Sequence, residues 1–405
     1  MRSARFICLV TFAMAPLIVR ADDLLDRAAE SLSFSGFDDQ VRARLSGLID
    51  FEFYHFTHEA PGLIFTDDHS LLSPRFTLFF DAQLGSNVYV FAQGRVDRGF
   101  DPGDGDLGIR LDEYAVRWTP WQDGRFSLQA GRFGTVAGNY VARHLSWENP
   151  FVNAPLIYES VTGIYDAEAP SSAGEFAEGL VEDKYDYNPV VWGPSYATGL
   201  AVSGKIGSFD YAAEIKNAAL SSRPESWDAT DDGFRHPSIS TRIGYRPDIA
   251  WNLGVSASEG AYFTGAAAHE LPHGTGIDDF KQKVLAQDVS FAWRHWQLWA
   301  EMYEARFEVP RVGNADVLGW YVEAKYKFSP RFFGALRVNQ MLFDNVPDGE
   351  GARQPWGHDL WRIDTAATFR LTPHAQVKLQ YSLQHEARVN DAVSHMIATQ
   401  FTVKF

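Results

Sequence analysis

Apolar and polar residues alternate with a period of two over many short stretches of this chain. In the segment HAQVKLQYSLQ (374–384), one parity is Ala, Val, Leu, Tyr and Leu, and the other is polar throughout. Successive side chains of a strand point to opposite faces, so this pattern predicts a strand with one apolar and one polar face. The last residues, MIATQFTVKF (396–405), have the same alternation and predict a closing strand that ends at Phe405.

About sixteen stretches share this pattern, and each has about the length that a tilted strand needs to cross a bilayer. They lie near 41–54, 74–85, 87–97, 108–119, 125–133, 196–206, 209–217, 238–246, 251–259, 284–294, 296–307, 317–328, 331–343, 359–371, 374–385 and 393–405.

The connections between these stretches alternate strictly between short and long. Short ones such as GSN (85–87) and LTPH (371–374) contain the residue types that form tight turns. Transmembrane barrels have short periplasmic turns and long extracellular loops, whereas a soluble β-sandwich has no reason to separate its connections in this way. The long connections are 55–73, 98–107, 134–195, 218–237, 260–283 and 344–358.

Mean hydropathy is only −0.23, and after the first residues no stretch approaches the ~20 apolar residues of a transmembrane helix. A closed barrel is the architecture that crosses a membrane with such a low hydropathy. We therefore predict an all-β fold, a transmembrane antiparallel β-barrel of about sixteen strands. Aromatic residues beside the short turns would form a rim at the membrane surface. They are Trp118, Trp121, Tyr245, Trp251, Trp293, Trp296 and Phe328.

The first residues have the features of an export signal. Arg2 and Arg5 precede an apolar run, and small residues around Ala21 suit a signal peptidase. We predict a signal peptide at 1–21, a short periplasmic segment at 22–40 and one barrel domain at 41–405. Cys8, the chain's one cysteine, falls within the signal. The mature chain therefore offers no disulfide, thiol nucleophile or cysteine-based zinc site.

The sequence offers little support for nucleic-acid binding, a metal site or catalysis. The chain has 52 acidic and 36 basic residues and a formal net charge of −16, which argues against nucleic-acid binding. No cofactor or metal site is expected, because DPGDGDLG (101–108) lacks the closing glutamate of a calcium loop. No enzymatic activity is expected either. His144, Ser146 and Glu148 are close in sequence, but no strained G-x-S-x-G turn is present.

With its export signal, alternating strands, short turns, long loops and the ending QFTVKF, the chain resembles the outer-membrane porins of Gram-negative bacteria. The segment 111–133 is similar to a hairpin common in phosphate-selective and related porins. The resemblance implies a location in the outer membrane, contact with its lipid and lipopolysaccharide, and a homotrimer. It also implies that Phe405 belongs to a signal read by the barrel-assembly machinery.

A barrel of about sixteen strands is wide enough to hold an aqueous channel. In the porins that this chain resembles, the third extracellular loop folds inward and narrows that channel. Here the third long connection, 134–195, is the longest, and we predict that it is the constriction loop. Its candidate acidic residues are Glu148, Glu159, Asp166, Glu168, Glu182 and Asp183.

Basic residues on the polar faces of strands near both ends of the chain form a candidate pore-lining wall. They are Arg42, Arg44, Arg75, Arg95, Arg117, Arg337, Arg362, Arg370 and Lys378. A basic wall opposite an acidic loop would create a field across the channel and affect ion selectivity. Alternatively, these charges simply pair with neighbours such as Asp50 and Glu52.

The sequence therefore predicts a porin that passes small hydrophilic solutes or inorganic ions by passive diffusion. Two alternatives stay open: an outer-membrane barrel enzyme of the lipase or protease type, and an adhesion or assembly barrel with a closed lumen. The preferred solute and the sign of charge selectivity do not follow from the pattern.

Overall fold

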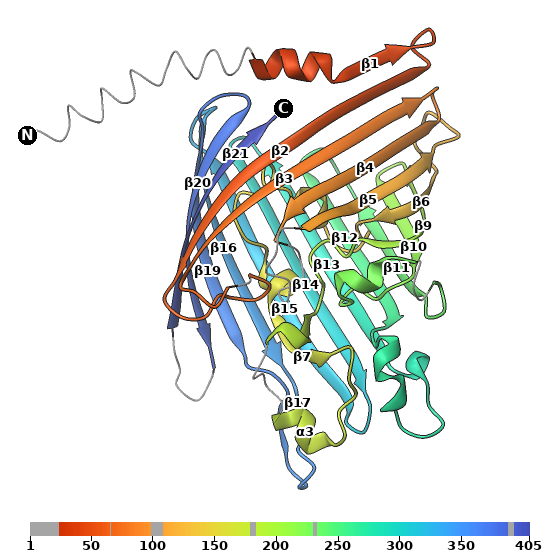
Figure 1. Ribbon diagram of the computed structural model, residues 1–405, viewed down its shortest axis with the longest axis vertical. Helices are drawn as coiled ribbons and strands as arrows, with labels where there is room; N and C mark the ends of the chain where they lie inside the picture. Colours follow the sequence, from red (N-terminus) through yellow and green to blue (C-terminus); the bar gives the residue numbers. More distant parts are fainter. Residues whose placement is uncertain (1–23, 65, 99–107, 179–183, 230–232, 388–392) are drawn as a thin grey trace, which may run out of the picture.

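The computed structural model describes residues 24–405 except 65, 99–107, 179–183, 230–232 and 388–392, so the predicted signal peptide lies outside the described residues. Within this part of the chain, sixteen antiparallel strands form a barrel (Figure 1). The first, β2, pairs with the last, β21, with Ile49 opposite Val403, and this pairing closes the barrel. The prediction of about sixteen strands is confirmed.

The strands of the barrel follow each other in chain order, and each pairs with its neighbours in sequence. They are β2 (Val41–Phe56), β3 (Ser70–Leu84), β4 (Val88–Asp97), β5 (Gly108–Trp118), β6 (Ser127–Phe133), β9 (Ala197–Ile206), β10 (Phe209–Lys216), β11 (Ser238–Tyr245), β12 (Trp251–Ala261), β13 (Lys281–Trp293), β14 (Trp296–Val309), β15 (Gly313–Lys327), β16 (Phe332–Phe343), β19 (Leu360–Arg370), β20 (Ala375–Glu386) and β21 (Val393–Lys404).

Both ends of the described chain lie at the short-turn end of the barrel (Figure 1). A helix at 24–31 leads into β1 (Ser33–Gly36), which pairs with the start of β2. Asp26 of this helix lies 2.9 Å from the His374 ring, in the turn between β19 and β20. At the other end of the chain, Phe405 and Gly47 exchange two backbone hydrogen bonds of 3.1 Å. The last residue is therefore held in the barrel wall.

One connection departs from the predicted strict alternation of short and long. The strands β14 and β15 run beyond their predicted ends, and only 310–312 join them at the long-loop end. Pairing continues as far as Val309 opposite Gly313, so residues expected in a loop belong to the wall. The outward residues of this extension, Glu308, Asn314 and Asp316, are polar, so they do not continue the apolar outward face that predicts a strand.

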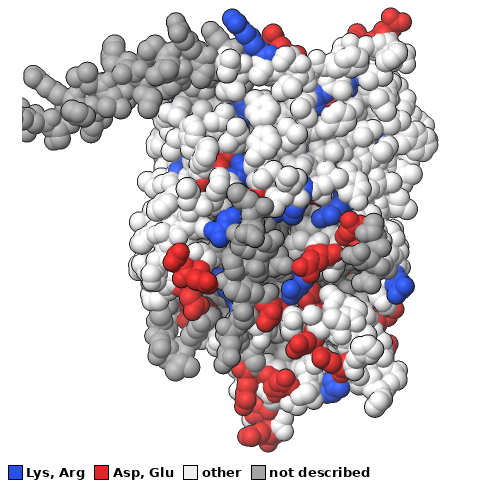
Figure 2. Space-filling model, in the orientation of Figure 1, with Lys and Arg blue, Asp and Glu red and all other residues white. Residues whose placement is uncertain are grey.

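The outer and inner faces follow the predicted parity. On β2, Phe51 and Phe53 are exposed while Asp50 and Glu52 are buried. The aromatic residues at the short turns are exposed as well, from 39% for Trp251 to 60% for Phe328. Figure 2 shows a broad band of uncharged surface below the short-turn end, with acidic side chains gathered toward the long-loop end. Such an apolar band between aromatic and polar rims suits a bilayer.

Among the described residues, no helix is long and apolar enough to span a membrane.

Candidate channel lining

The segment 134–195, which connects β6 to β9 and is called here the inner segment, is bonded to inward-facing side chains of the barrel. It contains η1 (Val141–Arg143), α2 (Leu156–Glu159), β7 (Val161–Tyr165), α3 (Ala173–Glu178), η2 (Lys184–Asp186) and β8 (Tyr187–Pro189). The strands β7 and β8 form a small two-stranded sheet of their own. Most of the largest buried apolar cluster lies between this segment and the inner faces of β12–β16.

Glu301 of β14 holds the first part of the inner segment. Its carboxylate is buried and accepts the backbone N–H of Tyr140 at 2.9 Å, that of Asn139, and the Tyr158 hydroxyl at 2.6 Å. Gly138 allows this close approach: its φ is +72°, and a Cβ there would lie 2.6 Å from a Glu301 oxygen. A carboxylate that accepts several donors in a buried site fixes the backbone that supplies them.

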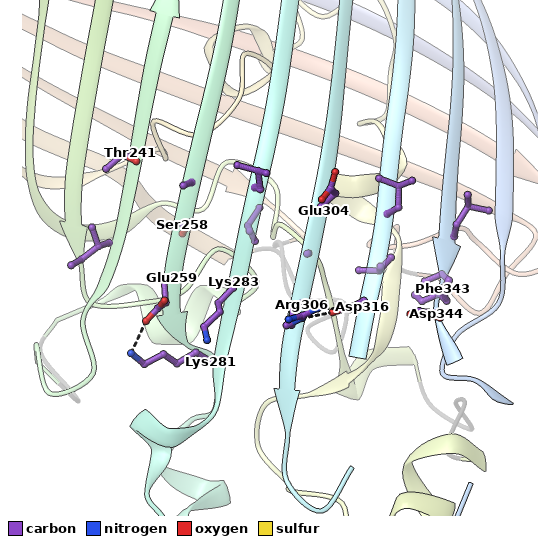
Figure 3. Close-up of a pocket in the computed structure, with 18 of the residues that line it drawn as sticks. Thr241, Ser258, Glu259, Lys281, Lys283, Glu304, Arg306, Asp316, Phe343 and Asp344 are labelled. Carbon is purple, nitrogen blue, oxygen red and sulfur yellow. Dashed lines mark hydrogen bonds and ion pairs between the residues drawn. The ribbon is translucent and has the colours of Figure 1, made fainter. Parts of the chain in front are cut away.

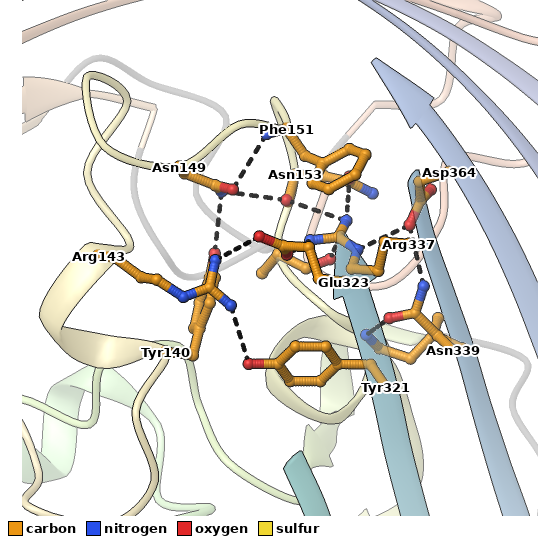
Figure 4. Close-up of polar contacts among 12 residues, drawn as sticks. Tyr140, Arg143, Asn149, Phe151, Asn153, Tyr321, Glu323, Arg337, Asn339 and Asp364 are labelled. Carbon is orange, nitrogen blue, oxygen red and sulfur yellow. Dashed lines mark hydrogen bonds and ion pairs between the residues drawn. The ribbon is translucent and has the colours of Figure 1, made fainter. Parts of the chain in front are cut away.

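Two arginines on neighbouring strands hold the middle of the inner segment, and Figure 4 shows the contacts of one of them, Arg337. Arg337 of β16 donates to the Asn153 backbone oxygen at 3.2 Å and to the Ala154 carbonyl at 3.1 Å. Arg362 of β19 donates to the Ala154 carbonyl and to Glu159, both at 2.5 Å. Both guanidinium groups also contact Asp364, at 2.9 and 3.1 Å. The wall therefore offers fixed donors to the turn at 153–154.

A third contact comes from the inner segment itself. Arg143 donates to Glu323 at 2.6 Å and to the Tyr321 hydroxyl at 3.1 Å, both on β15. Its guanidinium also lies 4.5 Å from the centre of the Trp299 ring on β14. Through Arg143, the inner segment is thus bonded to a strand that is far from it in sequence (Figure 4).

A cavity of about 200 Å³ remains between the inner segment and the wall formed by β2–β4. Arg75 projects into it from β3, with its Nε 3.4 Å from Asp50 and with a hydrogen bond from Nη2 to Glu52. Arg95 of β4 lines the same cavity, and its Nε lies 3.1 Å from Asp112. The wall of this cavity therefore carries both signs of charge in close alternation.

A second cavity, of about 530 Å³, lies nearer the short-turn end. Its lining includes Asp81, Arg117 and Gln129, and Arg117 donates to the Gln129 side chain at 2.9 Å. His144 and Leu145 of the inner segment line both cavities. These two residues of the inner segment therefore border both cavities.

Both ring nitrogens of His144 have partners. Nδ1 lies 2.5 Å from the Val141 carbonyl, and Nε2 lies 2.7 Å from the Tyr196 hydroxyl. With Nδ1 protonated, the neutral ring donates to the carbonyl and accepts from the tyrosine hydroxyl, so it can make both hydrogen bonds. Burial, followed by the nearby Arg95 charge, lowers the pKa of His144 from its ordinary 6.5 to about 4.

Protonation of His144 is expected to change the channel only near pH 4. The unfolded chain takes up this proton at about its ordinary pKa, so the contribution of His144 to stability declines as the pH falls from 6.5 toward 4. A charged ring would donate to the Tyr196 hydroxyl through Nε2 and could no longer accept from it, so this contact would have to reorient. We expect the conductance of the His144→Gln variant to lack a step near pH 4 that the parent shows. Equal pH profiles for the two proteins would contradict this prediction.

The structure divides the predicted basic wall into three groups. Arg75, Arg95 and Arg117 line the two cavities. Arg42 and Arg44 are exposed at the short-turn end, beside β1. The others are covered by the inner segment: Arg337, Arg362 and Lys378 are buried, and Arg370 lies 5.4 Å from the centre of the Trp147 ring. A pore-lining role for the whole set stays a prediction.

The predicted acidic residues of the loop are also placed differently from one another. Glu159 and Asp166 are buried and paired, Glu159 with Arg362 and Asp166 with Arg223 at 2.9 Å. Glu148 and Glu168 are exposed. Glu182 and Asp183 lie outside the described residues.

Sequence reasoning did not single out several residues that position the inner segment. Glu301, Glu323 and Asp364 have the inward parity of their strands, and that parity was the available signal. Asp112 was harder to place, because a β-bulge at Gln93/Gly94 shifts the register of β5. A β-bulge adds one residue to a strand, so side chains beyond it no longer follow the inward–outward alternation counted from before it.

Among the described residues, no group of three or more His, Cys, Asp or Glu side chains could hold a metal ion. The aspartates of DPGDGDLG considered as a calcium loop, Asp101, Asp104 and Asp106, fall outside those residues.

No protein-family model and no curated protein sequence matches this chain. Solved structures do. OmpF of Salmonella typhi, in a complex with daunomycin, matches with a TM-score of 0.56 at 12% identity over 92% of this chain and 100% of its own. An anion-selective porin from Comamonas acidovorans matches with a TM-score of 0.55 at 10% identity, over 90% and 100%.

An outer membrane protein of Vibrio cholerae, OmpT, matches in its trimer form with a TM-score of 0.54 at 10% identity, over 91% of this chain and 100% of its own. At these identities the likeness concerns the fold. The fold is that of the porins of the Gram-negative outer membrane: a closed, antiparallel, sixteen-stranded β-barrel.

Proposed function

We propose that this chain is a porin of the Gram-negative outer membrane, through which small hydrophilic solutes or ions diffuse passively. The observation that carries the proposal is the pair of cavities inside the barrel, which share His144 and Leu145 in their lining. Charged side chains line this path on the β2–β5 side. The inner segment acts as the constriction, because it occupies the opposite half of the lumen.

The charges along the path favour a polar solute. Arg75 stands against Asp50 and Glu52, and Arg95 stands against Asp112. Pore diameter and fixed charges at the narrowest point control which solutes pass through such channels. Ion selectivity would then depend on the balance of positive and negative charge in these pairs, and not on the basic residues alone.

An enzymatic role has weaker support. Ser146 and His144 are close in sequence, but the Val141 carbonyl and the Tyr196 hydroxyl already occupy both ring nitrogens of His144. A serine nucleophile needs a base within hydrogen-bonding reach that is free to take its proton. We therefore propose passive transport without catalysis or a cofactor.

The proposal extends to assembly. One of the matched structures is described as a trimer form, and we propose a homotrimer for this chain. Phe405, which is fixed against Gly47 at the seam between β2 and β21, is proposed as the residue read by the barrel-assembly machinery.

The test is single-channel recording of the refolded chain in a planar bilayer under a KCl gradient. We expect stable conductance steps, and we expect Arg75→Ala to shift the reversal potential toward cation selectivity, because Asp50 and Glu52 lose their cation. Arg306→Ala, on the outer face, is the matched control and should leave the reversal potential unchanged. A correctly folded barrel that stays silent would contradict the diffusion channel.

A further inference from the structure

The connection between β2 and β3 crosses the lumen at the long-loop end of the barrel. Its residues 57–64, called here the outer lid, begin beside the wall, where Ala60 and Ile64 pack on an apolar cluster of β2, β3 and β21. Leu63 packs on a second cluster, around Trp192 and Trp227, which includes the start of β9. The outer lid therefore reaches from the first strands of the barrel to β9, the strand that follows the inner segment.

The backbone of the outer lid lies directly on the inner segment. The Leu63 N–H donates at 2.9 Å to the carbonyl oxygen of Glu159, the last residue of α2. The preceding residue, Gly62, has a φ of +54°, and a Cβ there would clash with the same carbonyl oxygen. Glycine meets both demands, because it adopts positive φ readily and has no Cβ. The close approach of the lid to α2 therefore depends on glycine at position 62.

One lysine of the inner segment holds both ends of the turn in the outer lid. The Lys184 ammonium, from η2, donates to the Ala60 carbonyl at 2.7 Å and to the Ile64 carbonyl at 2.9 Å. Hydrogen bonds from a charged donor are stronger than those between neutral groups. Lys184 therefore clamps the turn at 60–64 against the inner segment.

The outer lid covers the smaller of the two cavities. Leu63 and Ile64 line that cavity of about 200 Å³, and they do so from the long-loop end, because the lid joins the long-loop ends of β2 and β3. His144 and Leu145 border the same cavity together with the second one, which lies nearer the short-turn end. A solute that enters from the long-loop side thus meets the outer lid before the constriction.

The outer lid is held less firmly than the inner segment. Residues 57–59 are exposed, and Leu63 and Ile64 are half-buried. By contrast, Glu301 and Arg362, which hold the inner segment, are buried and make charge-assisted hydrogen bonds. Segments with few buried contacts open at a lower free energy than the rest of a fold. The outer lid is then the element that opens first, while the inner segment stays in place.

We propose that the outer lid is a gate on the outer entrance of the channel, and that Lys184 holds it closed. This inference rests on the proposed function, because a gate regulates transport only where the lumen conducts. With the lid closed, the smaller cavity limits passage to small solutes and ions. With the lid released from Glu159 and Lys184, larger solutes reach the inner segment, which then sets the remaining limit.

Replacing Gly62 with alanine tests the gate. The added Cβ meets the Glu159 carbonyl and separates the lid from α2, so we expect a larger single-channel conductance in a planar bilayer. Gly85→Ala is the matched control, because Gly85, in the short turn between β3 and β4, has a φ of +59° and nothing within 4 Å of a Cβ. Both variants place alanine at a similar positive φ, and only Gly62→Ala adds the clash. Gly85→Ala should conduct as the parent does.

Thiol labelling follows the outer lid without relying on conduction. Ser73 of β3 lines the smaller cavity, and a cysteine there is the one thiol of the chain once Cys8 is replaced by serine. We expect a bulky maleimide to label Cys8→Ser/Ser73→Cys slowly, and about tenfold faster when Gly62→Ala is added. Lys184→Met removes the clamp without straining the loop. It should have the same effect, and it serves alone if Gly62→Ala does not refold.

Lys283→Met is the matched control for Lys184→Met. Lys283 lies on the outer face of β13, beside a groove in the outer wall (Figure 3), and donates to Glu308 at 2.6 Å. Its replacement should leave both the labelling rate and the conductance as in the parent.

The two measurements separate failure of the gate from failure of the channel. If folded Gly62→Ala is labelled no faster than Gly85→Ala, or Lys184→Met no faster than Lys283→Met, the outer lid does not open and the gate proposal is wrong. Faster labelling with unchanged conductance would also overturn it, because the lid would then move without controlling the channel. If labelling quickens while parent and variants all stay silent in the bilayer, the diffusion channel itself is contradicted, and the gate with it.

Discussion

Replacing Glu301 with alanine is expected to raise the single-channel conductance and to make its steps noisier. The Glu301 carboxylate accepts two backbone N–H groups of the inner segment and the Tyr158 hydroxyl in a buried site. Each donor left without a partner costs about 1–3 kcal/mol. The turn at 138–140 should then leave the wall of β14 and widen the path beside His144. Conductance in a planar bilayer measures the effect.

Glu304→Ala is the control for Glu301→Ala, because it removes the same group from the same strand on the outer face. Its conductance should equal that of the parent. Glu301→Gln keeps one acceptor oxygen and should give an intermediate conductance. An unchanged conductance in folded Glu301→Ala would show that this contact does not hold the constriction.

Replacing Arg362 with methionine is expected to lower the free energy of unfolding by about 3–5 kcal/mol, because it breaks a buried ion pair from one side. Glu159 would lose its guanidinium partner, and Asp364 would keep only Arg337. The Ala154 carbonyl would also lose a donor. Urea unfolding in lipid vesicles, followed by tryptophan fluorescence, measures the change.

Arg306→Met provides the comparison, since the pair between Arg306 and Asp316 is close in geometry but exposed. An exposed pair contributes about 0–1 kcal/mol. If both variants were destabilised equally, the buried network would not be what fixes the inner segment. If only Arg362→Met unfolded at a lower urea concentration than the parent, the result would support the role of Arg362 in holding the inner segment.

Of the three groups into which the predicted basic wall divides, the covered group and the group that lines the cavities have different surroundings for a physical reason. Parity placed all of them on the inner face, and the inner segment then covered one half of that face. Arg337 and Arg362 lie in the covered half and are bonded to carbonyls and carboxylates. Arg75 lies in the other half and borders a cavity. Strand parity contains no information about which half the segment occupies.

The sequence by itself determined the barrel. Alternation with a period of two fixes which side of each strand is apolar, and the turn residues fix where strands end, because both depend on local chemistry. Phe401, exposed, and Gln400, buried, on the closing strand follow that rule. Even the error at β14 and β15 was local: between residues 307 and 317 the outward positions, such as Glu308 and Asp316, are polar and do not continue the apolar outward face.

Only the tertiary structure decided how the lumen is divided. Contacts such as Tyr140 to Glu301 and Ala154 to Arg362 join residues far apart in the chain, and no local pattern specifies their pairing. The two cavities beside His144 are what remains after these long-range contacts are made. The same holds for charged residues on the outer face of β13–β15, because strand register brings Lys283 opposite Arg306 and Arg306 opposite Asp316.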